Sequence, residues 1–155
     1  MRKVIFNILV FSLFVIALAG CKKDDASEDS IAPKNIVGKQ LLFNGGSYDV
    51  SEFTSNGTCK IPEGTEYGIT TEVTKTPRYT YKRSDLKTAS FTCNYSEKST
   101  ILSNYTYYDA SFDLTLSFIT TTSGTLTGTV NFIKTGGNGG KSMYFTFKDK
   151  AFTLQ

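Results

Sequence analysis

Side chains that most often carry chemistry are scarce in this sequence. The 155 residues include no histidine, and the three cysteines are Cys21, Cys59 and Cys93. Without histidine there is no Ser-His-Asp triad, no Cys-His pair and no imidazole-ligated zinc site. No histidine can activate a cysteine as a nucleophile either, so carboxylates are the remaining candidates for acid–base chemistry.

Five carboxylates are candidates for such chemistry or for a calcium site. Glycosidases need two carboxylates at a defined separation, and calcium needs a cluster of oxygen ligands. The sequence shows no EF-hand or Asp-rich repeat, and surface charge at strand ends and loops accounts for all five. We therefore expect a non-enzymatic protein with no catalytic residue, no metal and no cofactor. The five are Glu63, Glu66, Glu72, Asp109 and Asp113.

Cys59 and Cys93 each fall on the apolar face of a predicted strand. An exported compartment permits a disulfide between them. In the chain-entropy model a bridge closing a loop of this length is worth roughly 3–4 kcal/mol. The alternative is two buried free thiols that act as small apolar residues. We expect the disulfide.

Two further motifs are candidates for binding. Tyr105, Tyr107 and Tyr108 form the densest aromatic group, and tyrosine is favoured at binding surfaces, although it is equally ordinary on a half-buried strand. Residues 136–140 are four glycines and an asparagine, followed by Lys141. A phosphate cradle needs a helix after the glycines. Since a strand pattern follows instead, we expect a hairpin loop.

The N-terminus has the pattern of an export signal. Basic Arg2 and Lys3 precede a mostly apolar run over residues 4–19, and Cys21 follows Leu18-Ala19-Gly20. The run is shorter than the ~20 residues of a membrane span and is typical of a signal peptide. Leu-Ala-Gly-Cys resembles the lipobox of bacterial lipoproteins, which implies cleavage before Cys21 and acylation of that residue with palmitate-type chains. We expect a signal peptide at 1–20, a lipid-anchored tether at 21–34 and a β domain at 35–155.

Residues 22–30 are charged or small and carry no large apolar side chain, so they predict a solvated spacer. Lysine followed by paired acids resembles the surface-export tag of Bacteroidota lipoproteins. This resemblance implies the bacterial outer membrane, with the protein exposed at the cell surface; the alternative is its periplasmic face. Asp29-Ser30-Ile31 resembles the O-glycosylation acceptor of that phylum, which makes Ser30 a candidate. The net charge of +3 is too small for nucleic-acid binding.

From about residue 36 onwards, apolar residues alternate with Thr, Ser and charged residues, which predicts half-buried strands. Turn signals separate them, among them Asn56-Gly57 between residues 48–54 and 58–61. Residues 96–102 remain open between loop, strand and helical turn. About eight to ten short strands in series predict an all-β fold, a single antiparallel up-and-down β-barrel, with a β-sandwich as the alternative. Clear alternation occurs at 79–82, 89–95, 111–118, 126–132 and 143–147.

Residues 36–42 resemble the first strand of lipocalin-like bacterial lipoproteins, and residues 53–58 resemble the hairpin that follows it. The resemblance implies a binding module for a small apolar or amphipathic ligand, held in a barrel of about eight strands. That function requires an unfilled interior. The alternative is a protein–protein interaction module, such as a complex subunit, an inhibitor or an immunity-type lipoprotein. A solid core with an exposed aromatic patch around Tyr105 would favour it.

Overall fold

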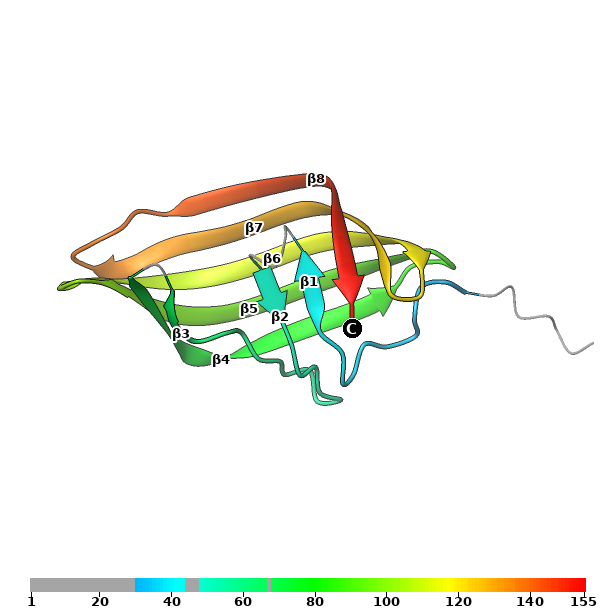
Figure 1. Cartoon of the computed structure of the whole chain (residues 1–155), viewed down its shortest axis with the longest axis horizontal. Helices are drawn as coiled ribbons and strands as arrows, with labels where there is room; N and C mark the ends of the chain where they lie inside the picture. Colours follow the sequence, from blue (N-terminus) through cyan, green and yellow to red (C-terminus); the bar gives the residue numbers. More distant parts are fainter. Residues whose placement is uncertain (1–29, 44–47, 67) are drawn as a thin grey trace, which may run out of the picture.

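We describe the protein from a computed structural model, whose described residues form eight antiparallel strands (Figure 1). The structure describes residues 30–43, 48–66 and 68–155, so Cys21, the signal peptide and most of the tether lie outside the described residues. The strands are β1 (Leu41–Phe43), β2 (Tyr48–Val50), β3 (Gly64–Glu66), β4 (Ile69–Arg83), β5 (Thr88–Ile101), β6 (Asn104–Thr120), β7 (Ser123–Gly137) and β8 (Met143–Leu154).

All eight strands belong to a single sheet in the order β2-β1-β8-β7-β6-β5-β4-β3. Strands β3 to β8 follow one another as antiparallel hairpins. The C-terminal end of β8 then pairs with β1, near the beginning of the domain. The sheet curls into a half-barrel with a concave and a convex face (Figure 1). The predicted up-and-down class is confirmed, with eight strands in one curled sheet rather than in the two packed sheets of a sandwich.

A short segment, residues 57–60, links the two ends of the sheet. On one side Ser51 and Lys60 exchange backbone hydrogen bonds of 2.9 and 2.8 Å. On the other, the Tyr79 N–H donates to the Gly57 carbonyl at 2.9 Å, and the Cys59 N–H donates to the Pro77 carbonyl at 3.3 Å. We call residues 57–60 the closing segment, because their backbone hydrogen bonds connect the chain just after β2 to β4.

The side chains of the interior are those at every second position of the strands. In β6, residues 106 to 118 alternate between buried and exposed, and the buried set faces the concave side. Phe43 of β1 packs edge-on against Phe112 and Phe147, with ring centroids 6.3 and 5.6 Å apart. On the opposite side of the core, Phe53 packs against Phe91 at 5.8 Å. Strands β1 and β2 cross in front of the concave side of the sheet (Figure 1).

Residues 30–34, which the composition assigns to the tether, contact the end of the sheet. Ala32 is buried, and its N–H donates to the Leu86 carbonyl at 2.9 Å. The Tyr81 hydroxyl donates to the Pro33 carbonyl at 2.9 Å, and burial raises the pKa of Tyr81 to about 12. The Ser30 hydroxyl accepts a 2.7 Å bond from Arg83. The glycosylation candidate therefore lies where the chain meets the folded domain.

Candidate binding face

The sheet separates the three tyrosines that the sequence groups together. Tyr105 and Tyr107 lie on the convex face of β6, with 40% and 39% of their surface exposed. Tyr108 lies on the concave face, is 5% exposed and packs edge-on against Phe132. Tyr105 and Tyr107 are thus available to a partner, and Tyr108 belongs to the core.

Tyr105 and Tyr107 form a small aromatic surface, the tyrosine pair. Their rings contact edge to face with centroids 5.7 Å apart. The Lys98 ammonium lies 5.9 Å from the Tyr105 ring centroid and 3.8 Å from the Glu72 carboxylate, so the cation is held over the ring. The Tyr105 N–H donates to the Asn138 side chain at 2.9 Å, which ties the start of β6 to the glycine loop.

Beside the tyrosine pair, a groove of about 600 Å³ runs over the convex face across four strands. Its floor is made of short polar side chains on β5 and β6, and Ile133 of β7 forms the far wall. The Ser96 hydroxyl donates to the Asp109 carboxylate at 2.6 Å within the floor. The floor side chains are Asn94, Ser96, Asp109 and Ser111.

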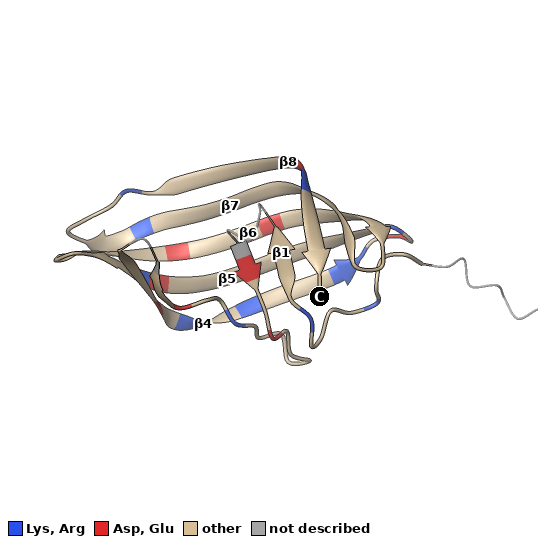
Figure 2. Cartoon of the chain, viewed as in Figure 1, with Lys and Arg blue, Asp and Glu red and all other residues tan. Residues whose placement is uncertain are grey.

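The near wall of the groove is basic and comes from an irregular part of β4. The register of β4 with β5 shifts between Val73 and Lys75 and again between Lys75 and Arg78. Such bulges re-aim side chains and bend a strand. Lys75 thereby pairs with Ser96, and Arg78 pairs with Asn94. Figure 2 shows the basic residues that recur along β4.

Neither wall cation is neutralised by the part of the chain that the structure describes. The ion pairs among these residues are Lys60–Glu52 and Lys98–Glu72, so neither Lys75 nor Arg78 has a described carboxylate within 4.0 Å. Asp109, across the floor, is engaged by Ser96. The convex face therefore combines two cations that have no described ion-pair partner with hydrogen-bonding groups and apolar side chains.

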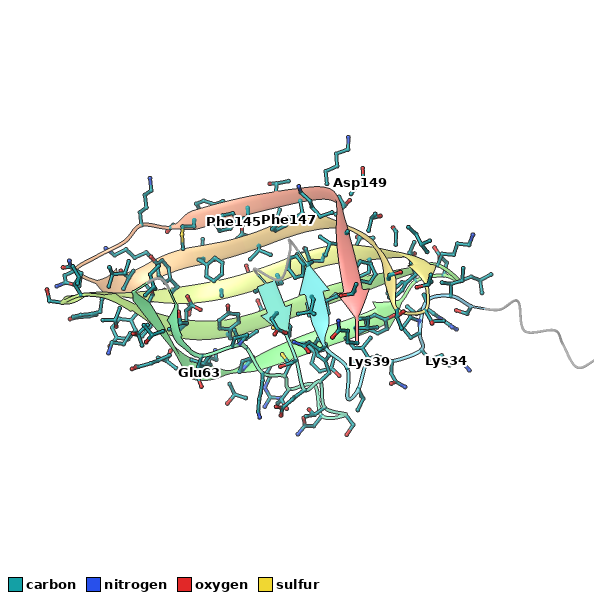
Figure 3. All side chains as sticks on the ribbon, viewed as in Figure 1. Lys34, Lys39, Glu63, Phe145, Phe147 and Asp149 are labelled. Carbon is teal, nitrogen blue, oxygen red and sulfur yellow. The ribbon has the colours of Figure 1, made fainter. Side chains whose placement is uncertain are left out.

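The concave face is largely filled by its own side chains where the structure describes it. Phe112, Leu114, Phe118 and Phe147 are each at most 5% exposed. Phe145 differs, with 37% exposed; it pairs with Val130 on the concave side and packs edge-on against Phe132 at 6.2 Å (Figure 3). Core packing thus accounts for four of these five apolar residues.

One charged residue, Glu97, lies within this core with 8% of its surface exposed. Burial raises its pKa, and a hydrogen bond from the Tyr95 side chain partly opposes the rise. Glu97 is not among the candidate residues that the sequence motifs indicate. Extending the alternation from Phe91 through Tyr95 by one more step would have placed it on the apolar face.

We predict that Glu97→Gln stabilises the protein at pH 8 and has little effect at pH 4. Because the folded pKa is raised, the native state binds more protons than the unfolded state above the ordinary value of 4.5, so stability falls as pH rises through that window. Glutamine removes the charge and with it this loss. Chemical denaturation at several pH values, with exposed Asp113→Asn as the control, would show it. Equal effects at both pH values would contradict the assignment.

Of the glycine-rich residues 136–140, Gly136 and Gly137 end β7, and the others lie in the hairpin connection that leads to β8. Their carbonyl groups face a cation: the Lys134 ammonium donates to the Gly139 carbonyl at 2.7 Å and to the Gly140 carbonyl at 3.4 Å. A phosphate cradle would instead offer backbone N–H groups to the ligand. The loop thus holds a lysine of its own strand in place.

The candidate carboxylates that the structure describes have different partners or none. Glu63 accepts the Val73 N–H at 2.6 Å, which satisfies a donor of β4; Glu63 is labelled near β3 in Figure 3. Glu72 contacts Lys98, Asp113 is exposed, and the side chain of Glu66 is not described. Among the described residues no group of three His, Cys, Asp or Glu side chains is placed to hold a metal ion.

Cys59 of the closing segment and Cys93 of β5 are brought together, with sulfur atoms 3.6 Å apart. Both are buried thiols, and the bond between them stays a prediction. Within the described ranges no helix is long and apolar enough to cross a membrane. Comparisons of the chain with protein-family models, curated proteins and solved structures give no significant match.

Proposed function

We propose that this protein is a lipid-anchored, non-enzymatic binding module of the bacterial outer membrane that binds a protein partner through its convex face. Anchorage at Cys21 and display at the cell surface rest on the lipobox and the acidic tag. Partner binding rests on the architecture. Of the two functions that the sequence suggests, a packed core with aromatic side chains outside it favours the interaction module.

The observation that carries the proposal is the exposed tyrosine pair beside a polar groove. Tyrosine offers a large, rigid contact area with a hydrogen-bonding tip and little conformational entropy to lose, and it is enriched at interfaces and among their hot spots. Ile133 and Tyr144 extend the apolar surface on β7 and β8, with 39% and 69% exposed. Exposed apolar groups rimmed by polar ones mark interaction sites.

Photocross-linking in the cells that produce the protein tests this function. With Tyr107→benzoylphenylalanine we expect a discrete protein adduct, identified by mass spectrometry, because this side chain lies within the proposed interface. The same replacement at Lys148, which is exposed on β8 outside the groove, is the control. With the purified partner, Tyr105→Ala should weaken binding about tenfold, as expected for a tyrosine hot spot. Equal adducts from both positions, or none from Tyr107, would refute the proposal.

Membrane attachment has a separate readout. In the same cells Cys21→Ser should move the protein from the membrane to the soluble fraction, because no acyl chain then holds it. A variant that still sediments with membranes would show that the anchor is not the lipid. The outcome at Cys21 does not depend on which face binds the partner.

A second candidate function, binding of a small amphipathic ligand on the concave face, is favoured by Phe145 and Glu97. Phe145 offers an exposed ring on that face, and Glu97 places a buried polar group on the same side. Native mass spectrometry of the full chain in detergent would decide between the two functions. A non-covalent mass that is lost on denaturation supports the ligand carrier.

A further inference from the structure

We propose that the convex groove binds an extended segment of the partner in which acidic and apolar residues alternate. The inference rests on the proposed function and names the chemistry of the partner at this site. Three features carry it: the two unpaired cations of one wall, their spacing along the strand, and the apolar opposite wall.

Charge complementarity is the first feature. Lys75 and Arg78 line the groove without a described carboxylate within 4.0 Å. Most described lysines and arginines likewise lack a carboxylate within 4.0 Å, but Lys75 and Arg78 are the two that line this groove together. A carboxylate brought to this wall would form charge-assisted hydrogen bonds, with arginine able to engage both oxygens.

The spacing of these cations is the second feature. Lys75 lies opposite Ser96 and Arg78 opposite Asn94, so they are two residues apart as counted on β5. Two residues of a strand span about 7 Å, which is also the distance between alternate side chains of an extended peptide. Carboxylates at positions i and i+2 of such a segment can therefore meet Lys75 and Arg78 together.

The opposite wall is the third feature. The sheet order places β7, and with it Ile133, across the floor from β4. Side chains of an extended peptide alternate between its two sides, so residues i+1 and i+3 would face Ile133. Asn94 and Ser111 on the floor can bond to the peptide backbone. A protein segment fits better than an acidic sugar, because sugar sites rely on tryptophan platforms and this chain has no tryptophan.

Fluorescence anisotropy with synthetic peptides tests the inference on the full chain in non-ionic detergent. The probe is a labelled decapeptide of alternating Glu and Tyr, and its comparator has Gln for Glu. We expect the Glu peptide to bind at least about tenfold more tightly at low salt, since two exposed ion pairs together contribute about that factor. Raising the ionic strength from about 0.01 to 0.15 M should weaken it, because the screening length falls from about 30 to 8 Å.

Matched variants assign the effect to the groove. Lys75→Gln with Arg78→Gln should abolish the preference for the Glu peptide, whereas Lys148→Gln with Lys150→Gln, the same change in net charge, should preserve it. Lys75→Glu with Arg78→Glu should reverse the preference towards a Lys–Tyr peptide. Lys148→Glu with Lys150→Glu, the same change in net charge, should not reverse the preference, which separates an effect of the groove from an effect of overall charge.

Three outcomes would overturn the inference. The first is equal binding of the Glu and Gln peptides. The second is an equal loss of the preference for the Glu peptide in the double Gln variant of the groove and in the double Gln variant of β8. The third is binding of polygalacturonate at the groove without binding of the peptide. The first two leave the interaction module standing if Tyr107 still cross-links to a protein. Failure of both the peptide test and the cross-link would remove the inference and the proposed function together.

Discussion

Oxidation of Cys59 and Cys93 to a disulfide is expected to raise the free energy of unfolding by roughly 3–4 kcal/mol. The two residues are 34 positions apart in the sequence, and their sulfur atoms lie 3.6 Å from one another. The bridge would constrain the unfolded chain over that loop. It would also tie the closing segment to β5, at the place where few backbone hydrogen bonds hold the two ends of the sheet together.

The two thiols are not equivalent in this reaction. The hydrogen bond to Cys93 lowers the pKa of Cys59, whereas that same bond, together with burial, raises the pKa of Cys93. We therefore expect Cys59 to be the thiolate that attacks an oxidised dithiol donor. Cys93 then displaces the donor sulfur, so that two cysteine thiols are oxidised and one donor disulfide is reduced to two thiols.

Guanidinium denaturation of the oxidised and reduced protein measures the stabilisation, after a mass two daltons lower has confirmed the bond. Cys59→Ser with Cys93→Ser is the control and should unfold at the same midpoint with and without reductant. If the native protein gives one midpoint under both conditions while the mass shows oxidation, the bridge contributes no stability. If no oxidised mass forms with excess donor, the thiols are structural.

Gly128→Val is expected to prevent folding, with a loss of more than about 4 kcal/mol. A Cβ at this position would lie 2.1 Å from the Asp113 carbonyl oxygen and 2.9 Å from the Leu114 Cα. Both atoms are backbone of β6, so a change of rotamer cannot relieve the contact. Gly128 also has φ of +147°, which side-chain-bearing residues rarely adopt.

The neighbours of Gly128 explain why the sheet cannot adjust to a larger residue at this position. It pairs with Leu114 and with Phe147, next to a register shift between Leu126 and Gly128. This irregularity lies close to the sharp bend of β8 near Asp149, beyond which β8 reaches β1 (Figures 1 and 3). Loss of the glycine would disturb β6, β7 and β8 together.

Gly38→Ala is the matched control, because Gly38 also has a positive φ, +76°, but no atom lies within 4 Å of a Cβ built there. It should cost only about 1 kcal/mol for the left-handed backbone. Soluble yield and thermal melting followed by circular dichroism would compare the two variants. A cooperative transition of Gly128→Val at the midpoint of Gly38→Ala would show that β6 and β7 can separate without cost.

The strands and the contents of the core follow from local pattern. Alternation placed Cys93 and Phe112 inside, and it separates Tyr107 from Tyr108 because successive residues of a strand face opposite sides. The same period identifies Glu97 as a charged residue in an apolar phase. Of residues 96–102, left open between three interpretations, 96–101 continue β5 because they pair with β6, and Leu102 begins the turn.

The candidate site could not be predicted from local sequence pattern in this way. The basic wall depends on two register shifts in β4, and bulges are set by tertiary packing as much as by the residues that form them. The groove also needs four strands in a particular alignment, which no local pattern specifies. Closure through residues 57–60 is likewise a long-range event: Asn56-Gly57 predicts the turn, and only the fold brings Gly57 to Tyr79.

The long strands also set how far the tyrosine pair stands from the end of the sheet that Ser30 contacts. Ser30 contacts Arg83 and Leu86 at one end of the sheet, and the turn at Leu102, 91% exposed, lies at the opposite end of β5. The 14 residues of β5 span about 45 Å at 3.3 Å per residue. With the proposed anchor, a domain standing on its attachment end would itself serve as the spacer, raising Tyr105 clear of the lipid headgroups and of shorter neighbouring molecules.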